Sequence, residues 1–369
     1  MRKERTLILQ TGFLGDLVLT LPLVRELHDA QPTARITLAV REGFADLVGK
    51  HPGVTETIEL RKRRGWLQRF RPDRERLRRL RAAGFDVVYL AHRSFRTGLY
   101  AWSTRAPRRV GFAGSPSRWA CTETVTYATD RHVSERLLAL GGGSDVDRRR
   151  ALSTPWYAAS EAARRAADNL LREHGVDRQS PFVTLAPGSV WPTKRWSPRG
   201  FATLARRFAE RGFVVVLLGT TSERELCTRV RREARGHAVN LAGRTGLADL
   251  AAILERATTH VGNDSGPGHL AAAVGTPVIA IFGPTDPAAG FRPWGERVLS
   301  VGFDGVLDCR PCSLHGSRLC PQGHHRCMGD LDPTDVIHRI DRWKLSPLSA
   351  DTPRVQHGGS SWRAPTRRC

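Results

Sequence analysis

Two kinds of hydrophobic pattern alternate along the chain. Short, nearly continuous apolar runs predict buried strands, and apolar residues at helical spacing predict helices that bury one face. Helical segments such as Leu17–Leu27 and Leu247–Arg256 separate the strands. This alternation is typical of an α/β fold with parallel sheets. The predicted strands are Thr6–Gln10, Arg35–Val40, Thr55–Leu60, Phe85–Leu90 and Arg109–Gly111 in the first half, and Phe182–Ala186, Phe213–Gly219, Thr258–Gly262 and Pro277–Phe282 in the second.

The length of the chain and one polar stretch predict two domains. At 369 residues the chain is long enough for two hydrophobic cores. Residues 145–150 are polar and predict a linker, so we expect one domain over residues 1–150 and another over residues 151–345. Residues 346–369 are rich in Pro, Ser and Arg, a composition that predicts a disordered tail.

The stretch around Asp264 is the strongest candidate site in the second half. It follows a predicted strand and precedes the small-residue helix start at residues 271–274. Such a turn leaves backbone N–H groups free at the positive end of a helix, where phosphate binds readily. Ser265 and Gly266 would offer these groups, and His269 lies one turn into the helix. The alternative is a turn whose residues only cap the helix.

Asp16 is the candidate acid-base residue of the first half. It lies in the first turn of a helix, just beyond the carboxyl end of the first predicted strand, where open α/β sheets bind ligands. Its carboxylate is either a helix cap or a general base pointing into a cleft. The preceding turn, Thr11–Gly15, lacks the third glycine and the spacing of a dinucleotide-binding fingerprint.

Positive charge dominates the composition and peaks between Arg61 and Arg81. The formal net charge is +22, which predicts attraction to polyanions. The peak interleaves eleven arginines and lysines with Trp66, Leu67 and Phe70. It suits an RNA-binding arm, a surface that meets an anionic membrane, or a solvated helix face. Its place beside the predicted cleft favours anion binding.

The N-terminal sequence and the cysteines indicate the cellular compartment and a candidate metal site. The first strand begins almost at once and no apolar run is long enough to span a membrane, so we expect a cytoplasmic protein. Four of the seven cysteines fall within one short segment. By number they suit a structural zinc site, although the spacing of the second pair is loose. Packing or an occasional disulfide is the other interpretation. These four are Cys309, Cys312, Cys320 and Cys327.

Five stretches, taken in order, resemble glycosyltransferase family 9, the lipopolysaccharide heptosyltransferases, and within it the type II enzymes most. The resemblance spans roughly residues 5–345, and the set is far more specific than any single member. The stretches are Gly15-Asp16 with Thr20-Leu21-Pro22, Pro187-Gly188-Ser189 with Thr193-Lys194-Arg195-Trp196, Asp264-Ser265-Gly266 with His269-Leu270, Phe282-Gly283-Pro284-Thr285-Asp286, and Cys309-Arg310-Pro311-Cys312 running to Gly323-His324-His325-Arg326-Cys327.

The resemblance implies a GT-B fold, in which two Rossmann-like domains face each other across a cleft. The N-terminal domain would bind the acceptor and the C-terminal domain the nucleotide-sugar donor. It implies inverting transfer of heptose from ADP-L-glycero-D-manno-heptose to the inner core of lipopolysaccharide, without a divalent metal or other cofactor.

The same resemblance assigns roles to individual residues. Asp16 would be the general base, and Lys194 would stabilise the leaving diphosphate. Structural alternatives are a surface position for Lys194, a helix-dipole contact for Glu223 and simple packing for His269. For the acceptor or the membrane we expect contacts from Arg61, Arg63 and Arg64. The implied donor-binding residues are Thr193, Glu223, Asp264, Ser265, Gly266 and His269.

The expected partners follow from this assignment. We expect a monomer that binds ADP-heptose and the lipopolysaccharide core, lies on the inner face of the inner membrane, and does not bind nucleic acid. One alternative keeps the family but changes the nucleotide sugar or the acceptor. Another is a non-catalytic basic protein that binds membrane or RNA.

Overall fold

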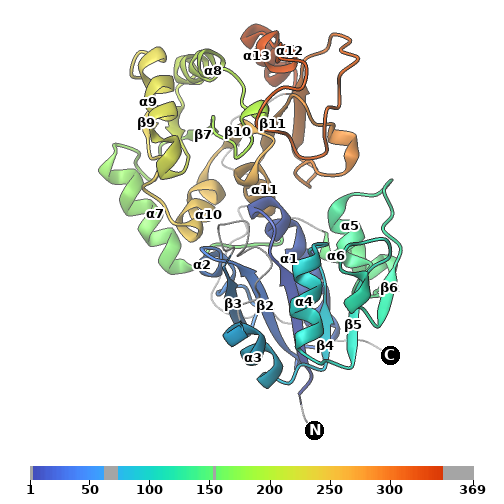
Figure 1. Ribbon diagram of the computed structural model, residues 1–369. Helices are drawn as coiled ribbons and strands as arrows, with labels where there is room; N and C mark the ends of the chain where they lie inside the picture. Colours follow the sequence, from blue (N-terminus) through green and yellow to red (C-terminus); the bar gives the residue numbers. More distant parts are fainter. Residues whose placement is uncertain (1–2, 62–73, 153–154, 344–369) are drawn as a thin grey trace.

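The computed structural model describes residues 3–61, 74–152 and 155–343, and it contains two parallel sheets, one in each half of the chain (Figure 1). Each sheet has six strands in the doubly wound order, in which the third strand lies at one edge and the first and fourth lie side by side. The predicted pair of Rossmann-like α/β domains is therefore confirmed. The tail at residues 346–369 lies outside the described residues.

The first sheet has the order β3-β2-β1-β4-β5-β6, and its strands are β1 (Arg5–Gln10), β2 (Arg35–Arg41), β3 (Glu56–Leu60), β4 (Val87–Tyr89), β5 (Arg108–Phe112) and β6 (Glu123–Val125). The predicted ends of its first five strands all agree with the structure to within two residues. β6 was not predicted, because it is a short, largely exposed edge strand with no apolar run. The helices of this half are α1 (Leu14–Ala30), α2 (Ala45–Val48), α3 (Arg74–Ala82), α4 (Phe95–Ser103), α5 (Val133–Leu138) and α6 (Asp145–Ala151), with a 3-10 turn η2 (Arg118–Ala120).

The second sheet repeats this arrangement with the order β12-β11-β10-β7-β8-β9. Its strands are β7 (Phe182–Ala186), β8 (Val214–Leu217), β9 (Val239–Asn240), β10 (Thr259–Asn263), β11 (Val278–Phe282) and β12 (Val298–Gly302). Its helices are α7 (Glu161–Glu173), α8 (Pro198–Glu210), α9 (Arg224–Glu233), α10 (Leu247–Arg256), α11 (Gly266–Ala273), α12 (Arg326–Gly329) and α13 (Pro333–Arg342), with 3-10 turns η3 (Pro192–Lys194), η4 (Thr221–Glu223) and η5 (Pro287–Ala289).

The stretch predicted as a linker, residues 145–150, is helical throughout, so this prediction was wrong. Ser144 caps α6, because its hydroxyl accepts from the Asp147 backbone N–H at 3.2 Å while the Asp147 carboxylate accepts from Ser144. α6 crosses the expected boundary at residue 150, and that boundary stays a prediction. Thr220 is the N-cap residue of η4, the turn before α9.

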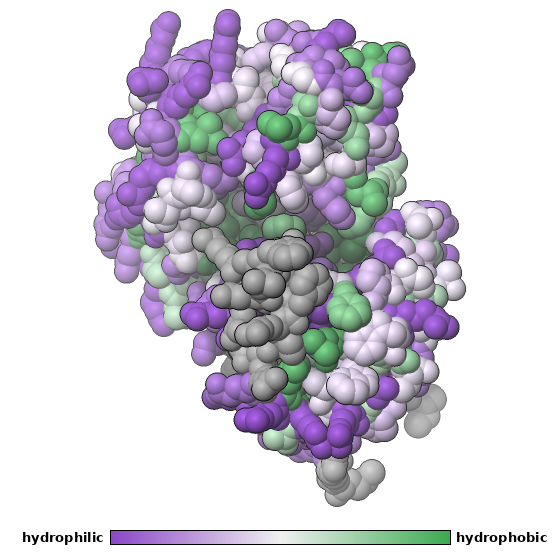
Figure 2. Space-filling model, in the orientation of Figure 1, coloured by the Kyte–Doolittle hydropathy of each residue, from purple (hydrophilic) through white to green (hydrophobic). Residues whose placement is uncertain are grey.

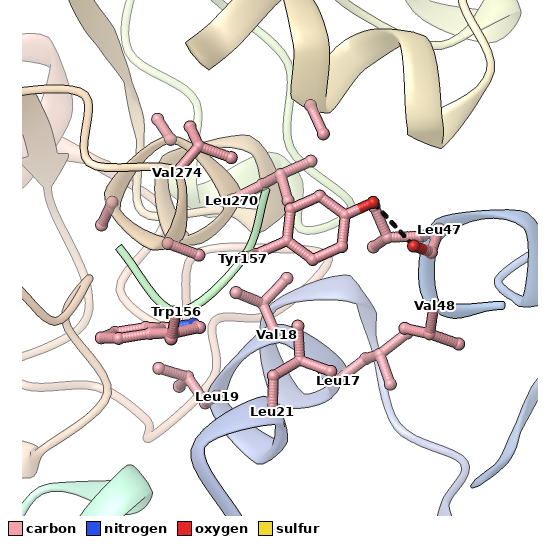
Figure 3. Close-up of a cluster of buried hydrophobic side chains, with 14 of the residues drawn as sticks. Leu17, Val18, Leu19, Leu21, Leu47, Val48, Trp156, Tyr157, Leu270 and Val274 are labelled. Carbon is pink, nitrogen blue, oxygen red and sulfur yellow. Dashed lines mark hydrogen bonds between the residues drawn. The ribbon is translucent and has the colours of Figure 1, made fainter. Parts of the chain in front are cut away.

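An apolar seam joins the two domains (Figure 3). Tyr157 lies between α1, α2 and α11, and its hydroxyl donates to the Leu47 carbonyl at 2.7 Å. Burial raises the pKa of Tyr157 to about 12, so this phenol remains a donor. The seam holds the start of α1 against the start of α11 (Figure 1). Its labelled members are Leu17, Val18, Leu19, Leu21, Leu47, Val48, Trp156, Tyr157, Leu270 and Val274.

A polar contact supports the seam beside α5. The His132 Nε2 atom lies 2.8 Å from the Arg292 carbonyl, and the Val133 N–H donates to the Gly290 carbonyl at 2.9 Å. Burial lowers the pKa of His132 to about 4, so its ring is neutral. Its Nδ1 atom accepts from Ser134, which leaves the proton on Nε2 to bridge the two domains. Within the described parts of the chain, no helix is long and apolar enough to cross a membrane.

Candidate functional site

The loops that follow β7 and β10 meet in the C-terminal domain. These strands are neighbours, and the order of the sheet reverses between them, which is where such sheets bind ligands. Lys194, from the first loop, forms an ion pair with Asp264, from the second. Both residues are buried. The Thr285 hydroxyl, at the end of β11, donates to the same carboxylate oxygen at 2.9 Å.

Asn263 fixes the backbone on which this ion pair depends. Its side-chain carbonyl accepts from the Trp196 N–H at 3.0 Å, and its amide donates to the Pro187 carbonyl at 2.8 Å. The Trp196 indole is buried and donates to the Leu331 carbonyl at 3.0 Å. The whole 187–196 loop is therefore tied to the end of β10, which sets the position of the Lys194 side chain.

The cysteine-rich loop, residues 309–325, packs against the other side of Lys194. Thr193 and Ser317 exchange hydrogen bonds: the Thr193 hydroxyl donates to the Ser317 carbonyl at 2.8 Å and accepts from its N–H at 2.9 Å. His325 Nε2 lies 2.7 Å from the Thr193 carbonyl. A Cβ atom on Gly316 would lie 2.7 Å from Cδ of Lys194, so only glycine permits this approach.

The start of α11 presents unsatisfied polar groups. The Ser265 hydroxyl and the Nδ1 atom of His269 are buried and lack a hydrogen-bond partner within the described residues. Native structures rarely leave such atoms unpaired unless water or a ligand completes them. Burial lowers the pKa of His269, an effect that Asp264 and Asp16 oppose and Lys194 reinforces. The imidazole is thus neutral and lies within electrostatic range of all three charges.

Asp16 occupies the third position of α1, in the N-terminal domain. Its carboxylate accepts from the Phe13 N–H at 2.8 Å, so it does help to cap the helix, although Phe13 is the N-cap residue. The side chain is half-buried. A carboxylate offers more than one acceptor site, so this single bond leaves Asp16 able to accept a further proton donor.

The starts of α1 and α11 meet across the domain boundary. A Cβ atom on Gly15 would lie 2.8 Å from the His269 ring, and one on Gly266 would lie 2.9 Å from the Leu14 side chain. The Phe13 and Trp191 rings also pair edge to face, 6.4 Å between centroids. Asp16 and Lys194 are far apart in sequence, yet both charges act on the same side chain, His269.

Glu223 lies at the same edge of the C-terminal sheet, beside Gly188. Its carboxylate accepts from the Thr220 N–H at 2.8 Å and from the Thr220 hydroxyl at 2.9 Å. A Cβ atom on Gly188 would overlap this carboxylate, so glycine is required in the turn after β7. Glu223 is half-buried and lies at the border of the site.

Of the three predicted acceptor-binding arginines, the structure describes only Arg61. Arg63 and Arg64 lie outside the described residues. Arg61 is exposed, and its guanidinium forms a 2.5 Å ion pair with Glu42. That pairing raises the pKa of Arg61 and occupies part of its hydrogen-bonding capacity.

The four clustered cysteines are free thiols. Cys312 donates to the Cys309 carbonyl at 2.8 Å, and Cys309 Sγ lies 3.9 Å from His324 Nε2. Burial and the neighbouring thiols raise the pKa of Cys327 to about 11. Across the described residues, no group of three or more His, Cys, Asp or Glu side chains is arranged to hold a metal ion. The zinc interpretation therefore gains no support from the geometry.

Three contributors were not singled out from the sequence. Thr285 follows an apolar strand within one of the five family-like stretches, so its place at the sheet edge could have identified it. His325 also lies within one of those stretches, but nothing in the sequence indicates its contact with Thr193. Ser317 lies in none of them, and both contacts depend on the folding of an irregular loop. A cavity of about 490 Å³ lies elsewhere, at the amino ends of β8 and β9, and is not part of this site.

Comparison with known proteins identifies relatives of this arrangement. The profile of "Glycosyltransferase family 9 (heptosyltransferase)" matches residues 74–319. Lipopolysaccharide heptosyltransferase 1 of Pseudomonas aeruginosa is 30% identical, over 93% of this chain and 99% of that protein. Lipopolysaccharide heptosyltransferase 2 of Escherichia coli K12 is 26% identical, over 91% of this chain and 97% of that protein. Type 1 and type 2 enzymes thus both match, and the identities do not single out type 2.

Solved structures share the fold. The structure of E. coli ADP-heptose lipopolysaccharide heptosyltransferase II has a TM-score of 0.72 with 22% identity, over 92% of this chain and 98% of that one. E. coli heptosyltransferase WaaC with ADP has a TM-score of 0.68 with 23% identity, over 92% and 99%. Together with the two doubly wound sheets, these likenesses confirm the predicted GT-B fold.

Proposed function

We propose that this protein transfers heptose from ADP-L-glycero-D-manno-heptose to the inner core of lipopolysaccharide, with inversion at the anomeric carbon. The chain belongs to glycosyltransferase family 9. The relatives support the sugar and the acceptor, since lipopolysaccharide heptosyltransferases match nearly the whole chain. One related solved structure is E. coli heptosyltransferase WaaC with ADP-2-deoxy-2-fluoro heptose. The observation that carries the proposal is the meeting of α1 and α11 at Gly15 and His269.

Asp16 would take the proton from the acceptor hydroxyl. An inverting transfer needs a carboxylate on the acceptor side of the cleft. It must reach the acceptor hydroxyl that attacks the anomeric carbon. Asp16 belongs to the N-terminal domain. It lies in the first turn of α1, the end of the helix that meets the C-terminal domain. Its bond to the Phe13 N–H fixes the orientation of the carboxylate, so little rearrangement would precede proton transfer.

Lys194 and the start of α11 would stabilise the leaving diphosphate. The ammonium supplies a positive charge, and the free N–H groups at Ser265 and Gly266 supply dipoles, in a site largely shielded from water. Asp264 forms an ion pair with Lys194. We expect the diphosphate to share the ammonium with Asp264 and the unpaired Ser265 hydroxyl to bind a phosphate oxygen. Asp264 would then be free to accept from hydroxyls of the sugar.

The remaining donor contacts fit the same pose. Glu223 would accept from ribose hydroxyls, and His269 would bind a phosphate or sugar oxygen through a ring nitrogen. A direct contact between Thr193 and phosphate would require its hydroxyl to give up one of its bonds with Ser317. Arg61, Arg63 and Arg64 would attract the anionic core, and the protein would work at the inner face of the inner membrane, as a monomer.

A donor screen tests the assignment. Purified protein is incubated with heptose-free core acceptor and, in parallel, with ADP-heptose, UDP-, GDP- and dTDP-sugars, and the product is detected by mass. We expect transfer from ADP-heptose alone. Transfer only from another donor would support the alternative in which the family is kept and the sugar changes. An acceptor that already carries its first heptose separates type 1 from type 2 activity.

A further inference from the structure

Three large aromatic side chains protrude from the N-terminal domain. Phe95 is 57% exposed, Trp102 58% and Trp119 46%. Phe95 and Trp102 stand seven residues apart on α4, with half-buried Leu99 between them, so they share one face of the helix. Thr97, Tyr100 and Ala101 form the opposite, buried face. Isolated exposed rings are common, but a row along one helix face is not.

Packing and a helix cap hold these aromatic side chains in place. The Phe95 and Trp119 rings lie 5.3 Å apart and are inclined by 36°. A Cβ atom on Gly98 would lie 3.2 Å from Ser117 and 3.3 Å from Trp119, so the small residue lets η2 come close to α4. Ser94 caps the helix by accepting from the Thr97 N–H at 3.2 Å. The aromatic rings are therefore held outward by the packing beneath them.

The segment of the chain that carries these rings has only positive charges. Residues 87–122 contain six arginines and no Asp or Glu. Arg105 and Arg118 are both exposed, and within the described residues neither has an ion pair. A surface that meets other proteins normally mixes both signs of charge, whereas Trp rings flanked by Arg are typical of the interface of an anionic bilayer.

The surface lies next to the acceptor side of the site. His92 Nδ1, just before α4, lies 2.8 Å from the Thr11 hydroxyl in the turn that leads to Asp16, and 3.2 Å from the Thr97 hydroxyl on α4. α4 lies at the front of the N-terminal domain (Figure 1). Figure 2 shows apolar and weakly polar residues gathered there, below the hollow between the two domains.

We propose that Phe95, Trp102 and Trp119, with Arg105 and Arg118, form the surface by which this protein docks on an anionic lipid bilayer. The inference rests on the proposed function in one respect, since an acceptor anchored in lipid must reach the cleft from a membrane. A single-stranded nucleic acid is the less favoured partner. It would need open ring faces for stacking, and Phe95 and Trp119 cover each other.

Vesicle co-sedimentation without any substrate tests this surface. The vesicles contain either phosphatidylglycerol with phosphatidylethanolamine or phosphatidylcholine alone. We expect the wild-type protein to bind only the anionic vesicles. Trp102→Ala with Trp119→Ala should weaken binding about tenfold or more, because each inserted ring buries a large apolar area. Val306→Ala, which truncates a 92% exposed side chain in the C-terminal half, is the control and should bind like the wild type.

The arginines have a charge-matched control. Arg105→Gln with Arg118→Gln should weaken binding on the order of tenfold, given the usual contribution of an arginine near an anionic surface. Arg199→Gln with Arg232→Gln removes the same net charge from exposed positions in the C-terminal domain. Equal loss in both pairs would mean that net charge alone drives binding, and the proposal would be wrong.

Two further measurements separate docking from catalysis and from other partners. Trp102→Phe with Trp119→Phe keeps the aromatic surface, so it should bind brominated anionic vesicles normally while its tryptophan fluorescence is quenched less. Every surface variant should retain wild-type turnover on a soluble, lipid-free core oligosaccharide. Absence of transfer with intact vesicle binding would sink the proposed function alone. Unchanged vesicle binding in the Trp→Ala variant, or loss of oligonucleotide binding instead, would overturn the docking surface.

Discussion

Gly15 and His269 lie against each other across the domain boundary: a Cβ atom added to Gly15 would approach the imidazole to 2.8 Å. This contact brings the helix that carries Asp16 to the helix that faces the donor site. It also leaves no room between the two helices, because the seam below them is filled with apolar side chains (Figure 3). The separation of the proposed base and the proposed leaving-group site is thus set by close packing.

Gly15→Ala should therefore reduce turnover. The added methyl group must displace either His269 or the start of α1, and overpacking of this kind typically costs about 1–3 kcal/mol. Gly268→Ala is the control, since its Cβ would meet only ordinary contacts at 3.5 Å or more. Steady-state kinetics and thermal unfolding of both variants check the prediction. Equal activity in the two would show that the Gly15 contact does not position the site.

Thr285 should position Asp264. Thr285→Val keeps the shape of the side chain but removes the hydroxyl that donates to the carboxylate at 2.9 Å. We expect kcat/KM for the donor to fall about tenfold to a hundredfold, the usual value of a bond to a charged group. Thr285→Ser restores the hydroxyl and should recover most of the loss. Failure of the serine variant to recover activity would point to packing instead.

The cysteine-rich loop should control Lys194. Gly316 and Gly323 both have positive φ, at 87° and 73°, but only a Cβ on Gly316 would press on the Lys194 side chain. Gly316→Ala and Gly323→Ala thus carry a similar backbone strain and differ in the contact. We expect weaker ADP binding in the first variant only, by calorimetry. A similar loss in both would assign the effect to strain in the loop.

Acid should destabilise the protein through buried histidines. Burial lowers the pKa of His260 to about 3, far below the value of about 6.5 in an unfolded chain. Below pH 6.5 the unfolded state therefore binds a proton that the folded state does not. The stabilisation is complete above pH 6.5 and is lost as the pH falls, by about 1.4 kcal/mol per pH unit for one such group.

His260→Asn should make this pH dependence shallower. Asparagine does not titrate in this range, and its side chain can still bond the Thr184 hydroxyl, which lies 3.0 Å from His260 Nδ1. Urea unfolding between pH 7 and pH 5 measures the slope. His237→Asn, at an exposed position, should leave the slope unchanged. Identical slopes in all three proteins would contradict the assignment to His260.

The sequence predicts most of the fold because its strands are buried on both faces. β7 and β11 are short apolar runs, and the polar turns after them had to meet at one sheet edge. β10 is also buried throughout, although its sequence, Thr-His-Val-Gly-Asn, is mostly polar. β6 was missed since an exposed edge strand needs no apolar run. The linker prediction overlooked the capping box between Ser144 and Asp147, which was present in the sequence.

The sequence names several residues of the candidate site, but it does not predict their contacts. Asp264 and Lys194 were found separately, and their ion pair depends on the neighbouring positions of β7 and β10. The contact between Gly15 and His269 depends on how two domains pack, and local pattern carries no information on that. The bonds between Thr193 and Ser317 likewise arise only after an irregular loop has folded over the sheet edge.

The most direct measurement compares turnover and ADP binding in Asp16→Asn. The amide retains an oxygen for the Phe13 N–H but cannot accept the acceptor's proton. The account predicts that turnover falls about a hundredfold to ten-thousandfold, the usual contribution of a general base, while the ADP dissociation constant stays within about twofold. Wild-type turnover in Asp16→Asn, or a loss of ADP binding as large as the loss of turnover, would contradict it.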